Sequence, residues 1–213
     1  MPLLKPARIP AFIKWCYPNW YVWDKPSAKP TVYLTFDDGP VPEVTPWVLD
    51  VLKKYNCKAT FFCIGENVKQ HPTIFKAILD EGHQIGNHTF NHLKGTSVNT
   101  HTYIQNTLKA QQYLDELMPQ SKTTLFRPPY GKIQRSQAKL LRERGYQIVM
   151  YRTIAYDWDA AISKEVCLEN ACKAKNGDLI VFHDSVKAYY NLEYVLPQAL
   201  AFYKNKGFEF GLL

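Results

Sequence analysis

The sequence lacks any long apolar run, and this absence bears on where the chain acts. No stretch reaches the roughly 18 consecutive apolar residues that a membrane-spanning helix needs. The first segment, 1–10, carries Lys5 and Arg8 but no apolar stretch followed by small residues, so it shows no secretory signal. We therefore expect a cytoplasmic protein, with a membrane-surface or exported location as alternatives.

The cysteines show no paired spacing. The chain has five cysteines, an odd number, and no Cys-x-x-Cys pair. They are scattered along the chain as Cys16, Cys57, Cys63, Cys167 and Cys172. This pattern favours buried, reduced thiols in a reducing compartment.

Nucleic-acid-binding motifs are also missing, although the chain is basic. Lys and Arg outnumber Asp and Glu by 26 to 19, which gives a formal net charge of +7. The basic residues are dispersed, apart from short groups such as 139–144. We expect a solvated basic surface and no nucleic-acid partner, and a face that binds a polyanion is the less favoured alternative.

The composition is otherwise that of one globular domain preceded by a short arm. With 213 residues, 46% of them hydrophobic, the chain is long enough to bury a full core. A linker-like stretch at 24–30 ends an aromatic and basic arm, residues 1–30, and the domain occupies 31–213. Pro10 and Pro18 break any long amphipathic helix, so we expect the arm to pack on the domain. Peripheral membrane contact by the arm is the less favoured alternative.

Short apolar runs alternate with amphipathic stretches, a pattern that predicts an α/β domain. Seven runs are typical of strands, namely 32–36, 59–64, 84–85, 124–126, 147–151, 179–182 and 208–210. In a barrel of parallel strands, the loops that follow the strands open on one face, where active sites lie. Polar segments that follow several of these runs would therefore converge.

Two of these polar segments are suited to metal chemistry. Residues 35–40 read TFDDGP, and residues 88–92 read HTFNH. Imidazoles at i and i+4 share one face of a helix, so we expect His88 and His92 to bind one metal ion. Two imidazoles and one of the adjacent carboxylates, Asp37 or Asp38, leave a coordination position open for water, and the other carboxylate is free to act as a base. Alone, the DDGP tetrapeptide is typical of a turn.

Three further polar segments follow predicted strands, at 127–131 (RPPYG), 157–159 (DWD) and 183–185 (HDS). The guanidinium of Arg127 suits a forked pair with a carboxylate. Prolines lack a backbone N–H, so Tyr130 is the first residue beyond Arg127 that is able to donate one. Asp159 and Asp184 are interpreted as surface or supporting groups. Since His71, His83 and His101 lie in turns or polar helical stretches, we expect no functional role for them.

In this order, the five segments resemble the polysaccharide deacetylases of carbohydrate esterase family 4, also called the NodB-homology domain. That family pattern reads Thr-Phe-Asp-Asp-Gly, His-(Ser/Thr)-x-x-His, Arg-x-Pro-Tyr-Gly, an Asp-Trp segment and a strand that ends in His-Asp. The matching segments here are 35–39, 88–92, 127–131, 157–158 and 181–184. The resemblance covers roughly 31–213. It implies a distorted (β/α) barrel with about seven parallel strands, and a metal-dependent hydrolase that removes N- or O-acetyl groups from an acetylated sugar or polysaccharide, releasing acetate.

The resemblance also implies roles for matched residues. The proton-transfer groups would be Asp37 as base and His183 as acid. The metal ligands would be Asp38, His88 and His92. The supporting groups would be Arg127 holding Asp37, Asp157 orienting His183, and Tyr130 donating its N–H to the oxyanion. The pocket for the acetyl group would be lined by Trp158, Val181, Pro128 and Pro129. The cation would be zinc, with Co2+, Ni2+ or Mn2+ as alternatives.

The chain departs from the family pattern at two positions. Val181 stands where relatives often have Leu, and this smaller wall would leave room for a slightly larger acyl group. Ile154 occupies a position that is often acidic. Two other functions stay open at this point. One is a deformylase or other amidohydrolase that acts on a lipid-linked or small acylated substrate, and the other is a non-catalytic sugar-binding module. The sequence does not predict the oligomeric state.

Overall fold

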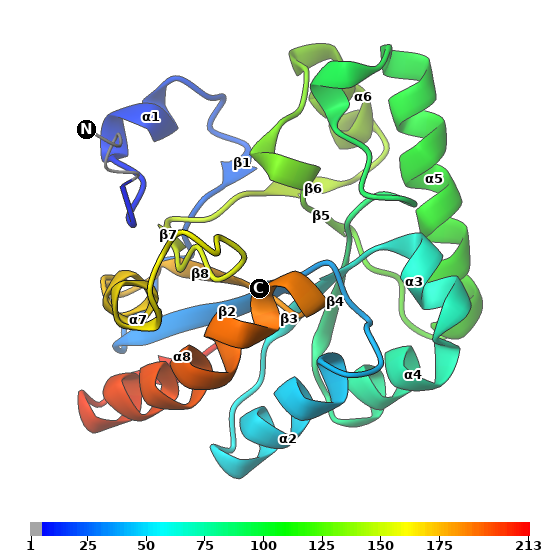
Figure 1. Ribbon diagram of the computed structural model, residues 1–213. Coiled ribbons are helices and arrows are strands. Elements are labelled where there is room, and N and C mark those ends of the chain that lie inside the picture. Colours follow the sequence, from blue (N-terminus) through cyan, green and yellow to red (C-terminus); the bar gives the residue numbers. More distant parts are fainter. Residues whose placement is uncertain (1–5) are drawn as a thin grey trace.

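A computed structural model describes residues 6–213 as a curled sheet of parallel strands with helices on its outer side (Figure 1). The strands are Tyr21–Val22 (β1), Thr31–Asp37 (β2), Thr60–Cys63 (β3), Gln84–Asn87 (β4), Leu125–Phe126 (β5), Gln147–Val149 (β6), Thr153–Ile154 (β7), Leu179–His183 (β8) and Glu209–Phe210 (β9). Their order across the sheet is β1-β6-β5-β4-β3-β2-β8-β7, and β9 pairs with β2. Every pairing between these strands is parallel, so the predicted distorted (β/α) barrel is confirmed.

The sheet in the described part of the chain has nine strands, close to the expected number of about seven. The two that the sequence did not reveal are β1 and β7, each of which is two residues long. A two-residue strand cannot display the alternation of polar and apolar residues by which strands are recognised.

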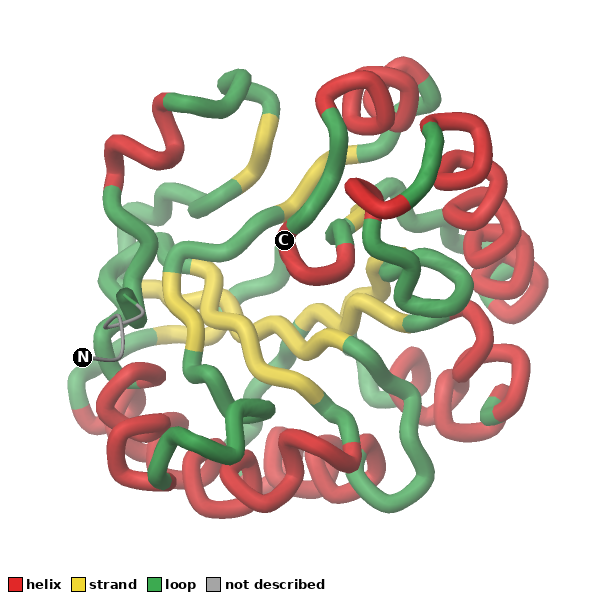
Figure 2. Tube along the Cα trace, turned by 45° about the horizontal axis from the view of Figure 1, so that its top comes forward, coloured by secondary structure: helices red, strands yellow, loops and turns green. Residues whose placement is uncertain are grey.

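Helices connect the strands and surround the curl, as Figure 2 shows. They are Ala11–Trp15 (α1), Thr45–Lys54 (α2), Gly65–Gln70 (α3), Pro72–Asp80 (α4), Thr100–Leu117 (α5), Arg135–Glu143 (α6), Lys164–Ala171 (α7) and Val186–Asn205 (α8). Parallel strands require such crossover connections, and the helices bury the outer face of the sheet. Within 6–213, no helix is both long enough and apolar enough to cross a membrane.

Strand β2 divides its side chains between two layers. Alternate residues pack against the helices in the main apolar core, namely Val32, Leu34 and Phe36. The Phe36 ring stacks on Phe61 of β3 and Phe182 of β8, with centroids 5.1 and 5.8 Å apart. The intervening residues face the interior of the curl, because successive side chains of a strand point to opposite sides. Asp37 is therefore carried into the interior by the same alternation that buries Phe36.

Strand β8 lies beside β2 in a register that brings two polar ends together. The pairing aligns Leu179 with Tyr33 and ends with His183 opposite Asp37. Ile180 and Phe182 pack in the outer core. By alternation, His183 faces the interior, on the same side as Asp37. Two neighbouring strands thus deliver an imidazole and a carboxylate to one place.

The N-terminal arm contacts the sheet through its described residues, while residues 1–5 of the predicted arm lie outside them. Strand β1 pairs with β6, and the guanidinium of Arg8 binds the buried carboxylate of Asp178 at 2.6 Å. Helix α1 ends at Trp15, whose side chain is 81% exposed. The arm therefore extends one edge of the sheet.

All five cysteines are free. Three are buried, as expected, and Cys172 is half-buried. Cys16 is exposed, so the prediction of buried thiols is wrong there, because it lies just after α1, a helix with no buried residue.

Candidate active site

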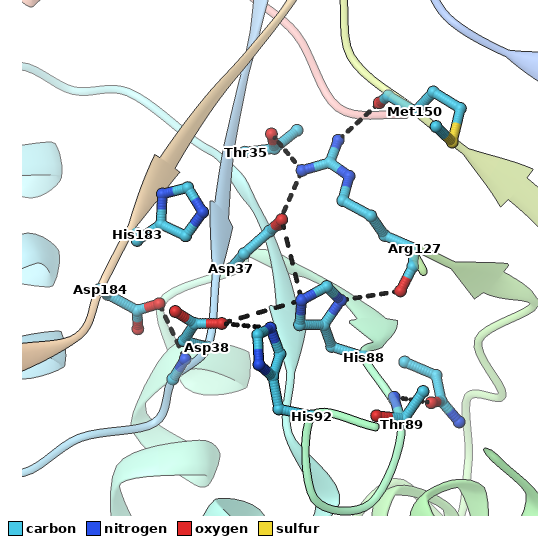
Figure 3. A network of polar contacts seen from close by, with 12 residues as sticks. Thr35, Asp37, Asp38, His88, Thr89, His92, Arg127, Met150, His183 and Asp184 are labelled. Carbon is cyan, nitrogen blue, oxygen red and sulfur yellow. Dashed lines mark hydrogen bonds and ion pairs between the residues drawn. The ribbon is translucent and has the colours of Figure 1, made fainter. Parts of the chain in front are cut away.

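A cavity of about 530 Å³ lies where the ends of β2 and β8 meet the loops that follow the other strands. Its wall combines acidic, imidazole and aromatic groups, and it is lined by Asp37, Asp38, His88, His92, Tyr130, Gly131, Tyr151, Ile154, Tyr156, Trp158, Val181, His183, Ser185 and Lys187. Figure 3 shows the central polar groups, which converge from separate elements. The carboxyl ends of parallel strands share one edge of a sheet, so distant segments of the chain meet here.

The adjacent aspartates at the end of β2 have different partners. Asp37 is the last residue of the strand and binds Arg127. Asp38 has a positive φ of 88°, which turns the chain out of the strand and directs its carboxylate to His88 and His92 (Figure 3). A positive φ is uncommon for residues other than glycine, and Asp is among those that tolerate it.

Arg127 is a buried clamp on Asp37. Only 1% of its surface is exposed, and its Nη1 donates to Oδ1 of Asp37 and to Oγ1 of Thr35, both at 2.7 Å. Its Nη2 donates to the Met150 carbonyl at 2.9 Å, and its guanidinium lies 4.1 Å from the centre of the Phe62 ring. Burial alone would raise the pKa of Asp37, but the guanidinium of Arg127 and the neighbouring imidazoles outweigh burial and lower it. Asp37 is therefore ionised.

The histidine pair does not lie on a helix, so the predicted helical geometry of His88 and His92 is wrong. The segment that follows β4 is a loop in which Thr89 and His92 have φ values of 65° and 57°. The side chain of Asn87 accepts a hydrogen bond from the Thr89 N–H at 2.9 Å and stabilises this turn. The two imidazole rings nevertheless face the same space, with centroids 5.1 Å apart.

The three residues predicted as metal ligands form one compact group. Oδ1 of Asp38 lies 3.3 Å from Nε2 of His92 and 3.8 Å from Nε2 of His88. Ligand atoms about 2.0–2.2 Å from a tetrahedral cation lie about 3.4 Å apart, close to these separations. That carboxylate oxygen is buried and accepts no hydrogen bond from the described residues, as expected of an atom that binds a cation. Asp38, His88 and His92 therefore fit a divalent metal.

Hydrogen bonding selects the nitrogen that His88 presents. Its Nδ1 lies 2.7 Å from the Arg127 carbonyl, an acceptor, so Nδ1 carries the proton and Nε2 offers a lone pair. Burial lowers the pKa of His88 to about 4, so the ring is neutral near pH 7. A neutral imidazole is the form that binds a metal.

His183 and Asp157 form a second pair on the opposite side of the cavity. Asp157 accepts from the backbone N–H of His183 at 2.7 Å, and its other oxygen lies 2.9 Å from Nδ1 of the ring. Burial would lower the pKa of His183, but the Asp157 carboxylate outweighs it and raises the pKa to about 9. The ring of Trp158 packs edge-on against the imidazole, with centroids 4.5 Å apart. His183 is thus oriented and protonated at neutral pH.

An apolar recess adjoins these polar groups. Ile154, Tyr156 and Val181 form one buried cluster, and Trp158 packs against it. Pro128 and Pro129 were also expected to line the pocket, but both are buried and absent from the cavity wall. They precede a tight turn in which Tyr130 has a φ of 60°, so they shape the loop.

Asp184, interpreted from the sequence as a surface or supporting group, is a supporting group and does not lie at the surface. It is fully buried, and its carboxylate accepts from the Gly39 N–H at 3.0 Å and from Oγ1 of Thr45 at 2.6 Å. Burial raises its pKa to about 8. A Cβ added at Gly39 would lie 1.9 Å from Oδ2 of Asp184. The end of β8 is therefore fastened to the turn that carries Asp38.

Other residues of the cavity wall were also missed, namely Tyr151, Tyr156, Ser185 and Lys187. Ser185 had a usable signal, because it belongs to the strand-end segment 183–185, whereas Lys187 lies two residues beyond it, in α8. Tyr151 ended a predicted strand, and the placement of a strand's last residue in a cavity depends on the curl of the sheet.

The parallel barrel, the His-His-Asp group and the carboxylate–imidazole pair together define a hydrolase with a metal centre at the carboxyl ends of the strands. The family model described as polysaccharide deacetylase matches residues 24–149. The chain belongs to the polysaccharide deacetylase family.

Relatives and solved structures agree with this assignment. A peptidoglycan-N-acetylglucosamine deacetylase of Bacillus cereus is 34% identical over 196 residues, which cover 91% of each chain. A chitooligosaccharide deacetylase of Azorhizobium caulinodans is 32% identical over 154 residues, covering 72% of this chain and 73% of that one. The crystal structure of a peptidoglycan N-acetylglucosamine deacetylase in complex with 4-naphthalen-1-yl-N-oxidanyl-benzamide has a TM-score of 0.82 and 35% identity, and the match covers 94% of both chains. The protein is a metal-dependent carbohydrate deacetylase that hydrolyses acetyl groups from an acetylated sugar.

Proposed function

We propose that this enzyme deacetylates N-acetylglucosamine residues of peptidoglycan, with Asp37 as general base and His183 as general acid. One observation carries the catalytic assignment: Asp37 and His183 are paired across β2 and β8 and line the same cavity, with pKa values shifted in opposite directions. When two titrating groups lie in environments that push their pKa values apart, one can be deprotonated and the other protonated at the same pH, as general acid–base catalysis requires. The substrate follows from the similarity to peptidoglycan deacetylases that match most of this chain.

The metal would be held by Asp38, His88 and His92. We infer zinc, because two imidazoles and one carboxylate form a common ligand set of catalytic zinc, whereas Co2+, Ni2+ and Mn2+ are the alternatives to test. When bound, the cation supplies Lewis acidity to the acyl oxygen and to the attacking water.

The remaining residues would move protons and position the acetyl group. Asp37, kept ionised by Arg127, accepts the proton of the attacking water. The Nδ1–H of His183 is hydrogen-bonded to Asp157, which orients the ring. The proton on Nε2 is then donated to the leaving nitrogen. The Tyr130 N–H would donate to the acyl oxygen. The acetyl methyl would occupy the apolar recess beside Trp158 and Val181.

The test is acetate release from purified peptidoglycan, chitin oligomers, acetylated xylan and a formylated sugar, each with and without a chelator. We expect the highest kcat/KM on peptidoglycan, loss of activity on chelation and recovery when Zn2+ is added. Asp37→Asn should lower kcat by roughly 10²–10⁴-fold, as is typical for loss of a proton-transfer group. Elemental analysis should find wild-type zinc content in this variant.

The control variant is Asp50→Asn, which alters an exposed carboxylate on α2. It should retain full activity. Undiminished turnover in Asp37→Asn would refute the base assignment, and a preference for xylan or chitin over peptidoglycan would refute the substrate.

A further inference from the structure

A second hollow, which we call the lysine groove, adjoins the catalytic cavity. It has a volume of about 660 Å³ and is lined by Asn91, His92, Leu93, Lys94, Ser97, Tyr130 and Lys132. His92 and Tyr130 also line the catalytic cavity, so the two hollows lie next to each other and share these side chains. The Tyr130 ring is 61% exposed and packs 4.5 Å from the His92 ring. A glycan whose acetylated sugar fills the catalytic cavity would therefore extend over Tyr130 into the lysine groove.

The charge of this groove has one sign. Lys94 and Lys132 are both exposed, and neither ammonium pairs with a carboxylate in the part of the chain that the structure describes. No Asp or Glu lines the groove. The amide of Asn91 accepts from Asn106 through its oxygen, at 2.9 Å, which leaves its NH₂ group available as a donor. The groove thus offers donors and positive charge, which match an anionic group.

The two lysines are held near each other by the contact between their loops. The N–H of Gly95, the residue after Lys94, donates to the carbonyl of Lys132 at 3.2 Å. The buried side chain of Gln137 donates to the Gly95 carbonyl at 2.8 Å, and that of Gln134 donates to Val98 at 3.0 Å. These bonds link the loop after β4 to the loop after β5.

Glycine is required at this contact. A Cβ on Gly95 would lie 2.8 Å from the Lys132 carbonyl and 2.6 Å from the side-chain oxygen of Gln137. Since the loops are fastened together, the backbones of Lys94 and Lys132 stay close to each other, and both side chains line the same groove. An anion bound in the groove would be attracted by both ammonium groups.

We propose that the lysine groove binds a sugar carboxylate next to the acetylated sugar that reacts, so that the enzyme selects acidic glycans over neutral ones. This inference rests on the proposed function. In peptidoglycan, the partner of N-acetylglucosamine is N-acetylmuramic acid, whose lactyl group bears a free carboxyl wherever the stem peptide has been removed. Chitin oligomers have no such group. Lys94 and Lys132 are therefore specificity residues that contact a neighbouring sugar, outside the metal centre.

The test compares three soluble substrates that share the reacting sugar. They are peptidoglycan glycan fragments freed of their stem peptides, the same fragments with the lactyl carboxyl converted to an amide, and chitotetraose. Acetate release gives kcat and KM for the wild type, Lys94→Gln, Lys132→Gln and the double variant. The control is Lys122→Gln, an exposed lysine that lines neither hollow.

We expect the double variant to raise KM for the acidic fragments roughly tenfold, as two exposed ion pairs would, with little change in kcat. The KM values for the amidated fragments and chitotetraose should not change in the double variant. Added salt should raise the wild-type KM only for the acidic fragments. Lys122→Gln should match the wild type on all three substrates. Equal effects of the double variant on acidic and neutral substrates, or no effect at all, would overturn the proposal.

Binding separates this inference from the proposed function. Calorimetric titration of the acidic fragments into Asp37→Asn, with and without the two lysine substitutions, measures the affinity of the groove in the absence of turnover. If the wild type deacetylates none of the substrates but the lysine substitutions weaken binding of the fragments, the proposed function is wrong and the binding role of the groove is supported. If the fragments are deacetylated but the lysine substitutions do not change their affinity, the proposed function is supported and the binding role of the groove is wrong.

Discussion

The pairing of Asp157 with His183 leads to a quantitative prediction about pH. In Asp157→Asn, the side chain loses the charge that outweighs the effect of burial on the imidazole. The pKa of His183, raised to about 9 by Asp157, should then fall to its ordinary value of 6.5 or lower. The acid form is the active one, so rate is lost as pH rises through this pKa. The alkaline limb of kcat/KM therefore moves to lower pH.

The size of the effect follows from the fraction of His183 that is protonated. With pKa values of about 9 and 6.5, the variant falls behind the wild type by about 30-fold at pH 8 but by only about 1.3-fold at pH 6, from protonation alone. A cation at Asp38 and the two histidines lowers the His183 pKa in both proteins, so the difference between them persists. The amide also disturbs the orientation of the ring, which adds a loss that is independent of pH.

The assay is acetate release from peptidoglycan over pH 5–10, with the zinc content of each preparation measured. Asp50→Asn serves as the control and should retain the wild-type profile. A variant whose alkaline limb stays in place, or whose deficit is the same at every pH, would show that Asp157 does not set the protonation of His183.

Three other perturbations test the residues of the active site and the packing that supports the fold. Arg127→Met leaves the buried Asp37 carboxylate unpaired and should lower the free energy of unfolding by about 3–5 kcal/mol in urea denaturation. Combining it with Asp37→Asn should recover part of that loss. Gly39→Ala forces a methyl group against Asp184, so it should destabilise the fold by about 1–3 kcal/mol and weaken zinc binding measured by competition with a chelating dye. Burial lowers the pKa of His83 to about 4, so the folded state resists its protonation, and stability should fall by about 3 kcal/mol as pH drops from 6.5 to 4. His83→Asn keeps a hydrogen-bond acceptor there but does not titrate, and a denaturation series that showed no flattening of this pH dependence would contradict the assignment.

Much of the fold was predictable because the long strands carry their own pattern. The alternation in β2 reports which of its residues face the helices, and its neighbour β8 is a continuous apolar run that ends at His183, so Asp37 and His183 could be placed at strand ends. Strands β1 and β7 had no such pattern, since pairing rather than local sequence makes two residues extended.

The site was less predictable where backbone turns decide the geometry. The spacing of His88 and His92 indicated a helix, but positive φ values at Thr89 and His92 bring the rings together from a loop. The burial of Asp184 depends on contact with Gly39, which is 145 positions away in the chain. The adjacency of Lys94 and Lys132 likewise arises from a bond between two loops, and charge patterning along the sequence cannot reveal it.

The division of labour between Asp37 and Asp38 has a consequence for protein engineering. Asp37 is the last residue of the central strand β2 and Asp38 follows it directly, and β2 is paired with β3 on one side and β8 on the other. Lys94 and Lys132, by contrast, lie on loops that surround this strand end. Changing residues 94 and 132 while His92 and Tyr130 are kept is thus a route to new polymer preferences that spares the reaction chemistry. Inserting a single residue upstream in β2 would abolish activity, because a shift of one position moves inward-facing side chains such as Asp37 to the outer face of the sheet.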